Sequence, residues 1–328
     1  MHKITFFGIV LLLLLLTLNV SLGAIAIEWG EIFKGNEAYD WQKWLVINDR
    51  LPRSFLAFLC GANLALCGAM MQSVFNNPLA GPTTLGINSG ASLGVAVSIF
   101  LGSYIPFMYP QISILFFAFV GALLFLFVLL YFHKVFKSIT TLLIIGLLLG
   151  YVSFSFIEIF IKFAQSKNIQ NFAFWGMGSF NNSNWLMVCI LSIVSIYSYV
   201  FAFKKTNLFN LLLLGKDELQ LMGYNMQKNR LHIFIIVGIL VATVTAFAGP
   251  LAFVGVAIPN AIKMISKQSN HQFIFKQSIV WGGILCLFAD FLTRGVLWDT
   301  ILPINAILSL LSLPIIFIFL FQNKYHGN

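Results

Sequence analysis

The amino-acid sequence predicts an all-α polytopic membrane protein with about ten transmembrane helices. Hydrophobic residues make up 59% of the 328 residues, and charged residues only 9%, against roughly 25% in soluble domains. Apolar runs close to the roughly 20 residues that cross a bilayer recur from one end of the chain to the other. No hydrophilic stretch is long enough for a soluble domain, so residues 1–328 are expected to form a single transmembrane domain.

The expected spans follow the apolar runs. Two of them, 84–103 and 251–266, are short and rich in small residues, which let helices pack closely. The first run could instead be a cleaved signal peptide, but its length favours a retained span. The expected spans are residues 4–23, 53–75, 84–103, 111–132, 139–163, 185–203, 230–248, 251–266, 273–292 and 302–321.

The distribution of positive charge indicates an orientation in the membrane. The net charge is +9, but the lysines and arginines are spread over the segments between spans, which argues against a nucleic-acid-binding face. With ten spans and a cytoplasmic N-terminus, twelve of the nineteen lysines and arginines fall on cytoplasmic segments. Both termini are therefore expected to be cytoplasmic.

No motif in the sequence predicts catalysis or metal binding. The chain has neither a phosphate-binding G-x-x-x-x-G-K-[ST] loop nor an H-E-x-x-H motif. The four cysteines lie inside apolar runs without C-x-x-C spacing, and the five histidines lie at helix ends or termini. We therefore expect no catalytic residue, no metal ligand and no cofactor bound by this chain.

Two apolar runs end in segments broken by proline and glycine. Gln72 precedes Asn77-Pro78-Leu79-Ala80-Gly81, and Gly249-Pro250-Leu251-Ala252 repeats part of this pattern. Broken backbone inside a membrane is tolerated only where it is buried in protein or lines a cavity. On the expected topology the two segments lie near opposite faces, as in an inverted repeat. They predict a path through the membrane rather than a simple anchor.

The polar segment 204–229 differs from the other connections. Residues 216–223 can form a short amphipathic helix that stops at Gly223, with Leu219 and Met222 on its apolar edge. Such a helix between two spans suits the docking of a soluble cytoplasmic partner. A helix that lies on lipid headgroups is an equally open alternative.

Together these features resemble the FecCD family, the membrane subunits of ATP-driven importers for ferric siderophores, haem and cobalamin. The resemblance covers nearly the whole chain and depends on the order and spacing of several motifs. They are Arg50-Leu51-Pro52-Arg53, Gln72 with Asn77-Pro78-Leu79-Ala80, Trp175-Gly176-Met177-Gly178-Ser179, Gly249-Pro250-Leu251-Ala252-Phe253-Val254-Gly255 with Pro259, Ala289-Asp290 with Arg294, and Leu302-Pro303-Ile304.

The resemblance implies a type II ABC importer permease fold in the bacterial cytoplasmic membrane. It implies four kinds of partner. Two are membrane partners: the lipid bilayer and a second permease subunit, which is either identical or different. The others are two ATP-binding subunits, which hold ATP and Mg²⁺, and an extracytoplasmic substrate-binding protein. The implied function is translocation of an iron chelate by alternating access, with a ferric siderophore preferred and haem or cobalamin as alternatives. The chain itself would be a non-catalytic conduit.

Three groups of site residues follow from the resemblance. In the family, arginines at the outer face receive acidic side chains of the binding protein. Arg50, Arg53 and Arg294 match these arginines, and contact with lipid headgroups is the alternative role. The segment that couples to the ATPase is matched by Lys216, Asp217, Glu218, Leu219, Met222 and Gly223. The inner gate is matched by Ser138, Ile139 and Thr140, although Ser138 could equally be an ordinary helix N-cap.

The chain departs from the family pattern at a few positions, and two other classes of function need residues that the sequence lacks or places elsewhere. Asn260 and Lys263 replace histidine and arginine, while Ile301 and Asn305 replace an acidic residue and glycine, which could mark one half of a heterodimer. An ion-coupled secondary transporter needs ionisable groups within the membrane, and the only acidic residues in the expected spans are Glu158 and Asp290, toward their outer ends. A membrane enzyme needs convergent titratable groups, for which the sequence gives no candidate set.

Overall fold

The computed structural model describes residues 2–23, 25–34, 37–102, 110–136, 138–213, 222–294 and 302–326. Within these ranges, all regular secondary structure is helical, and eight helices are long and apolar enough to cross a membrane. These eight coincide with eight of the expected spans. The prediction of an all-α polytopic membrane protein is therefore confirmed.

The helices follow one another along the chain with short connections. The long ones are α1 (His2–Ser21), α4 (Leu51–Phe75), α6 (Pro110–Val135), α7 (Ile139–Phe163), α9 (Trp185–Lys204), α12 (Met226–Ala248), α14 (His271–Thr293) and α15 (Ile304–His326). The shorter ones are α2 (Trp29–Phe33), α3 (Asp40–Leu45), α5 (Ile87–Leu101), α8 (Ser166–Gly176), α10 (Thr206–Leu212) and α13 (Val254–Ser266). Two short 3₁₀-helices are η1 (Glu37–Tyr39) and η3 (Pro82–Leu85), and η2 (Val46–Arg50) is a short π-helix.

The two remaining expected spans, 84–103 and 251–266, correspond to α5 and α13. These apolar helices have 15 and 13 residues. At about 1.5 Å per residue they are shorter than the roughly 30 Å hydrocarbon core. The count of about ten spans is therefore not confirmed.

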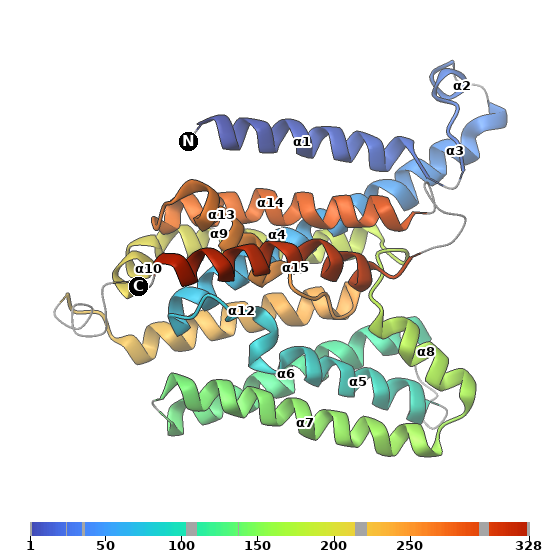
Figure 1. Ribbon diagram of the computed structural model, residues 1–328. Helices are drawn as coiled ribbons and strands as arrows, with labels where there is room; N and C mark the ends of the chain where they lie inside the picture. Colours follow the sequence, from blue (N-terminus) through green and yellow to red (C-terminus); the bar gives the residue numbers. More distant parts are fainter. Residues whose placement is uncertain are drawn as a thin grey trace.

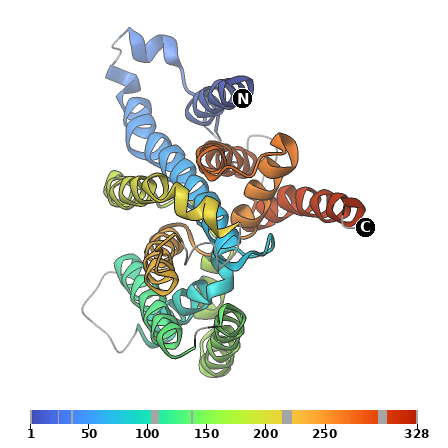
Figure 2. The same ribbon diagram turned by 90° about the vertical axis from the view of Figure 1, so that its left-hand side faces the viewer.

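The long helices lie side by side with their axes along one direction (Figure 1). The N- and C-terminal helices begin and end toward the same end of this bundle, and α2, α3 and α8 lie at the opposite end. Following the predicted orientation, these are called the inner and the outer end. α4 packs against α9, α12, α13 and α14, and it is the most buried of the eight candidate spans (Figure 2). It is the central helix of the bundle.

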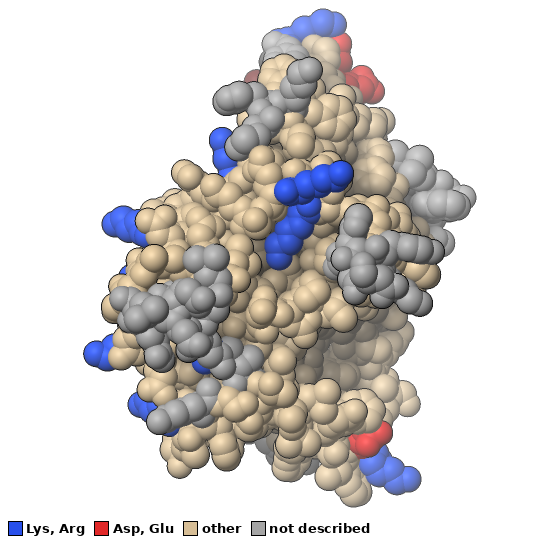
Figure 3. Space-filling model, turned by 60° about the vertical axis from the view of Figure 1, so that its left-hand side comes forward, with Lys and Arg blue, Asp and Glu red and all other residues tan. Residues whose placement is uncertain are grey.

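Charged residues are distributed unequally between the two ends. The acidic residues that the structure describes all lie toward the outer end or in the segments beyond it: Glu28, Glu31, Glu37, Asp40, Asp49, Glu158 and Asp290. On the face in Figure 3, separate lysine and arginine groups are scattered widely, whereas acidic groups appear only at the upper tip and at the lower right edge. The positive-inside rule counts lysines and arginines, and acidic residues contribute little to it, so the orientation stays a prediction.

The backbone of α4 approaches two neighbours so closely that only glycine fits. A Cβ atom at Gly68 would lie 1.6 Å from the carbonyl oxygen of Gly255 in α13. A Cβ atom at Gly61 would lie 2.1 Å from the carbonyl oxygen of Gly282 in α14. Membrane helices associate through such close packing of small residues, because lipid supplies no hydrophobic driving force between them.

Both short apolar helices follow a break in the backbone. After α4, Asn76 adopts a left-handed conformation with φ of 46°, and η3 and α5 follow. After α12, Gly249 and Phe253 have φ of 76° and 61°, and α13 follows. Because α4 ends at the inner end and α12 at the outer end, the two broken segments lie on opposite sides of the bundle (Figure 1), as the sequence predicted.

Residues Ser166–Gly176, between the expected spans 139–163 and 185–203, form helix α8. α8 packs against α5, where the rings of Phe172 and Phe100 have centroids 5.6 Å apart. The residues that form α8 mix polar and apolar types too evenly for a hydropathy-based search for spans to mark them.

We expect Gly68→Ala to lower the thermal stability of the detergent-purified protein. The new Cβ would overlap the backbone of Gly255, so α4 and α13 would have to separate. Overpacking commonly costs about 1–3 kcal/mol, and a backbone atom cannot yield as a flexible side chain does. Gly102→Ala is the control, since nothing lies within 4 Å of a Cβ atom there. Equal unfolding temperatures for the two variants would contradict the close crossing.

Candidate functional site

An ion-pair network lies at the outer end of α4 and α14. The buried carboxylate of Asp290 holds two guanidinium groups. Arg53 Nη2 lies 2.7 Å from Asp290 Oδ1, and Arg294 Nη2 lies 2.6 Å from Oδ2. Arg294 lies one helical turn from Asp290 along α14. Spacing in the sequence did not indicate Arg53, because that partner lies on another helix.

Two of the arginines also anchor the end of α1. Arg50 donates hydrogen bonds to the backbone carbonyls of Val20, Ser21 and Ile25. Arg294 donates to the carbonyl of Asn19 and, at 3.1 Å, to Ser54 Oγ. The bonds to Asn19, Val20 and Ser21 satisfy carbonyl groups that helix α1 leaves open at its C-terminus, and the bond to Ile25 holds the segment that follows. The arginines therefore join the outer ends of α1, α4 and α14.

Docking and headgroup contact, the two roles expected of these arginines, both need exposed side chains, but two of the three arginines are buried. Arg50 is 4% exposed and Arg294 is 7% exposed, since internal partners occupy their guanidinium groups. Burial lowers the pKa of Arg294 and the nearby Asp290 carboxylate opposes this shift, so the guanidinium stays charged. A role of these arginines in docking remains a prediction.

Arg53 is the arginine that borders an outer cavity. This cavity has a volume of about 280 Å³. Its walls come from the end of α8 and the following turn, from the end of α14, and from the start of α15. Phe174, Met177 and Pro303 are among the lining residues. Arg53 thus presents a partly exposed cation at a small opening on the outer end.

The outer broken segment is held by Asn305, a residue that departs from the family pattern. Its Nδ2 donates to the carbonyls of Gly176, at 3.1 Å, and Pro250, and its Oδ1 accepts from Ala252 N at 3.1 Å. A Cβ atom at Gly249 would lie 2.8 Å from the carbonyl oxygen of Trp175. One amide side chain thus connects α15 with both motif segments at the outer end.

The inner broken segment is held from α13, the helix that contains Pro259. Asn260 Nδ2 donates to the Pro78 carbonyl at 2.8 Å, and Lys263 Nζ donates to Gln72 Oε1 at 2.9 Å. Within the segment, Asn77 Oδ1 accepts from Leu79 N at 2.9 Å, an Asx-turn. Two departures from the family pattern, Asn260 and Lys263, therefore make the contacts between α13 and the end of α4.

The gate and coupling residues that the structure describes lie at the inner end. Ser138 is the N-cap of α7, where its hydroxyl accepts from Thr141 N at 3.4 Å, and Thr140 is exposed. The side chain of Ile139 lies outside the described residues, as do Lys216, Asp217, Glu218 and Leu219. Met222 is 61% exposed, and Gly223 has φ of 78°, a left-handed conformation that favours glycine. Gate and coupling roles stay predictions.

The chain belongs to the FecCD transport family, whose model matches residues 11–322. It is 28% identical to the hemin transport system permease protein HmuU of Yersinia pestis, over 94% of this chain and 92% of that protein. It is 31% identical to the vitamin B12 import system permease protein BtuC of Pectobacterium atrosepticum, over 97% of this chain and 93% of that protein.

A solved structure has the same fold. It is described as an inward-facing conformation of a metal-chelate type ABC transporter, and it superimposes with a TM-score of 0.87. The match has 25% sequence identity and covers 98% of this chain and 100% of that one. The chain is accordingly a multi-pass permease subunit of an ABC importer, and ATP hydrolysis belongs to other subunits.

We expect Asp290→Asn to destabilise the protein strongly, because it leaves two guanidinium groups without their buried counter-charge. Removing one partner from a buried ion pair typically costs about 3–5 kcal/mol. The measurement is thermal or denaturant unfolding in detergent. Lys34→Gln is the control, since its ion pair with Glu31 is exposed and such pairs contribute about 0–1 kcal/mol. Similar effects of the two substitutions would contradict a structural role for the network.

Proposed function

We propose that this chain is the subunit through which an ATP-driven importer carries a metal chelate across the bacterial cytoplasmic membrane. The match to permease subunits over almost the whole chain, in both sequence and fold, is the observation that carries the proposal. The relatives named for hemin and vitamin B12 and the metal-chelate transporter share one kind of cargo, a metal held by an organic ligand. Haem, cobalamin and ferric siderophores are the candidates, and the names of these relatives give no preference to a siderophore.

The exposed face of α7 supports a water-filled path beside this chain. Glu158 and Lys162 are exposed near its outer end, and Tyr151 is 64% exposed. A charged side chain facing lipid is costly, so charges on a span usually face a bundle interior or a water-filled cavity. We infer that α7 borders the path shared with a second permease subunit. Ser138, Ile139 and Thr140, at the inner start of the same helix, are then placed to form its gate.

The inner end also fits the expected contact with an ATP-binding subunit. The segment 204–229 lies between two long helices, α9 and α12, so a movement of this segment can be transmitted to both. In this proposal Met222 and the turn at Gly223 belong to the contact surface, together with the sequence-predicted residues Lys216, Asp217, Glu218 and Leu219.

Transport with defined components tests the function. The permease is reconstituted in proteoliposomes with its ATP-binding subunits and its binding protein, and uptake of hemin, cyanocobalamin and a ferric siderophore is measured. We expect one chelate to accumulate only when ATP is present inside, with no loss when a protonophore is added. Uptake that collapses with the protonophore while ATP stays constant would instead indicate an ion-coupled transporter.

Docking of the binding protein at the outer end gives a further prediction. Arg53 borders the outer cavity. Its Nε and Nη2 bond to Asp290 and Thr293, and its Nη1 makes no hydrogen bond to the described residues, so Nη1 can donate to a carboxylate of a partner. We expect Arg53→Glu to weaken association with the binding protein, most strongly at low salt, where charge contacts are least screened. Lys43→Glu, which reverses an exposed charge away from the cavity, is the matched control.

Surface plasmon resonance on the purified complex measures this association. Thermal unfolding of Arg53→Glu is recorded in parallel, because Arg53 also pairs with Asp290. Reversing Arg294 is less informative, since that side chain is buried in the ion-pair network. Unchanged association of a folded Arg53→Glu variant would rule out the docking role.

A further inference from the structure

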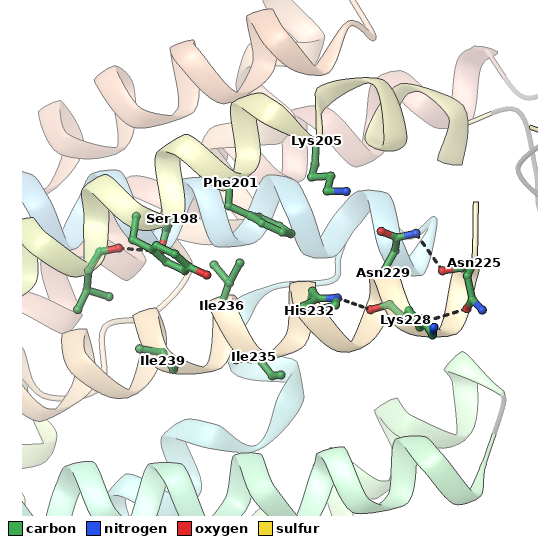
Figure 4. A pocket seen from close by; sticks show the side chains of 12 residues that line it. Ser198, Phe201, Lys205, Asn225, Lys228, Asn229, His232, Ile235, Ile236 and Ile239 are labelled. Carbon is green, nitrogen blue, oxygen red and sulfur yellow. Dashed lines mark hydrogen bonds between the residues drawn. The ribbon is translucent and has the colours of Figure 1, made fainter. Parts of the chain in front are cut away.

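A second and larger cavity lies between α9 and α12 near the inner end (Figure 4). Its volume is about 570 Å³, within the range of roughly 300–1,000 Å³ that is typical of ligand pockets. None of its residues belongs to the docking, gate or family-motif groups. The lining residues are Val194, Tyr197, Ser198, Phe201, Lys205, Asn225, Lys228, Asn229, His232, Ile235, Ile236 and Ile239.

The cavity has a polar half and an apolar half. Figure 4 shows Lys205 extending from the end of α9 into the space between the helices, toward Asn229 of α12, with Lys228 and His232 nearby on α12. Phe201, Ile236 and Ile239 lie farther from the helix ends. From residue 228 to residue 239 an α-helix rises about 16 Å. A cation at the membrane edge thus continues into an apolar wall that runs toward the membrane centre.

The positive charges of the polar half have no counter-charge among the described residues. The Nζ atoms of Lys205 and Lys228 have neither a hydrogen-bond nor an ion-pair partner there, and no acidic residue lines the cavity. His232 Nδ1 donates to the Lys228 carbonyl at 2.8 Å, which leaves Nε2 for another partner. Asp217 and Glu218, the acidic residues closest in sequence, lie outside the described residues.

The apolar half is continuous with a surface that faces the membrane. Along α9, Ile193, Ile196 and Tyr197 are 64%, 62% and 67% exposed. An exposed apolar surface of this extent on a transmembrane helix is covered by lipid tails or by another membrane helix. The cavity is therefore open to a molecule that arrives from the bilayer with a charged head and a long apolar tail.

We propose that this cavity binds one anionic glycerophospholipid of the cytoplasmic leaflet. The phosphodiester lies between Lys205 and Lys228, and an acyl chain runs along Phe201, Ile236 and Ile239. Basic pockets between transmembrane helices on the cytoplasmic side suit anionic headgroups, through charge and hydrogen bonding. This assignment rests on the proposed orientation, with α9 ending in the cytoplasm.

The bound lipid would contact both ends of the segment proposed to couple to the ATPase. Lys205 follows α9 at the start of that segment, and Asn225 and Lys228 stand where it joins α12. A lipid in the cavity would hold these two ends at a fixed separation.

Native mass spectrometry of the full-length permease, purified with its partner subunits, tests the proposal. Phosphatidylglycerol and phosphatidylcholine with identical acyl chains are titrated separately. We expect one phosphatidylglycerol to be retained in preference to phosphatidylcholine, and Lys205→Gln with Lys228→Gln to weaken that binding about 25-fold, or about fivefold for each lysine. The matched control, Lys134→Gln with Lys204→Gln, removes the same charge from inner helix ends that do not line the cavity, and should leave the affinity unchanged.

The apolar half and the source of the phosphate have their own tests. Ile239→Trp, which fills part of the apolar wall, should reduce phosphatidylglycerol binding, and inorganic phosphate should not displace the lipid. Equal binding of the two lipids, an equal loss in the control variant, or full displacement by inorganic phosphate would each overturn the proposal. These measurements need no transport, so their failure is distinguishable from failure of the proposed function.

Discussion

The close approach of α4 to its neighbours is the constraint on which the rest of the structure depends. At Gly68 and Gly61 the helix touches the backbone of α13 and α14, which leaves no room for a side chain. α4 carries Arg53 at its outer end and Gln72 at its inner end, so its position fixes both polar regions of the chain. Since lipid provides no hydrophobic force between helices, close packing and internal hydrogen bonds must hold this arrangement.

The broken segments add a second requirement, because backbone groups released from a helix need partners inside a membrane. An unsatisfied polar group there costs several kcal/mol. Side-chain amides meet this need: Asn305 bonds to Pro250 and Ala252 at the outer break, and Asn260 bonds to Pro78 at the inner break. The chain departs from its family pattern at these two positions, yet both residues bind the broken backbone directly.

Charged side chains have different partners at the two ends of the bundle. At the outer end one buried carboxylate holds two guanidinium groups, and such a network is costly to disturb because the charges have left water. At the inner end Lys205 and Lys228 lack partners among the described residues and border a cavity. The Asp290 network therefore joins helices at the outer end, while Lys205 and Lys228 have no counter-charge among the described residues.

The sequence by itself determined the features that depend on local composition and spacing. Long apolar runs can only be helices in a membrane, so the all-α class and eight of the spans followed from hydropathy. The order of the motifs identified the family. Only the tertiary structure decided what depends on distant segments meeting: the pairing of Arg53 with Asp290, the burial of Arg50 against the end of α1, and the cavity between α9 and α12. Hydropathy marks a residue as apolar or polar, but it does not specify which neighbour covers that residue. The neighbour depends on how closely the helices approach one another. Here Gly61 and Gly68 of α4 set that distance.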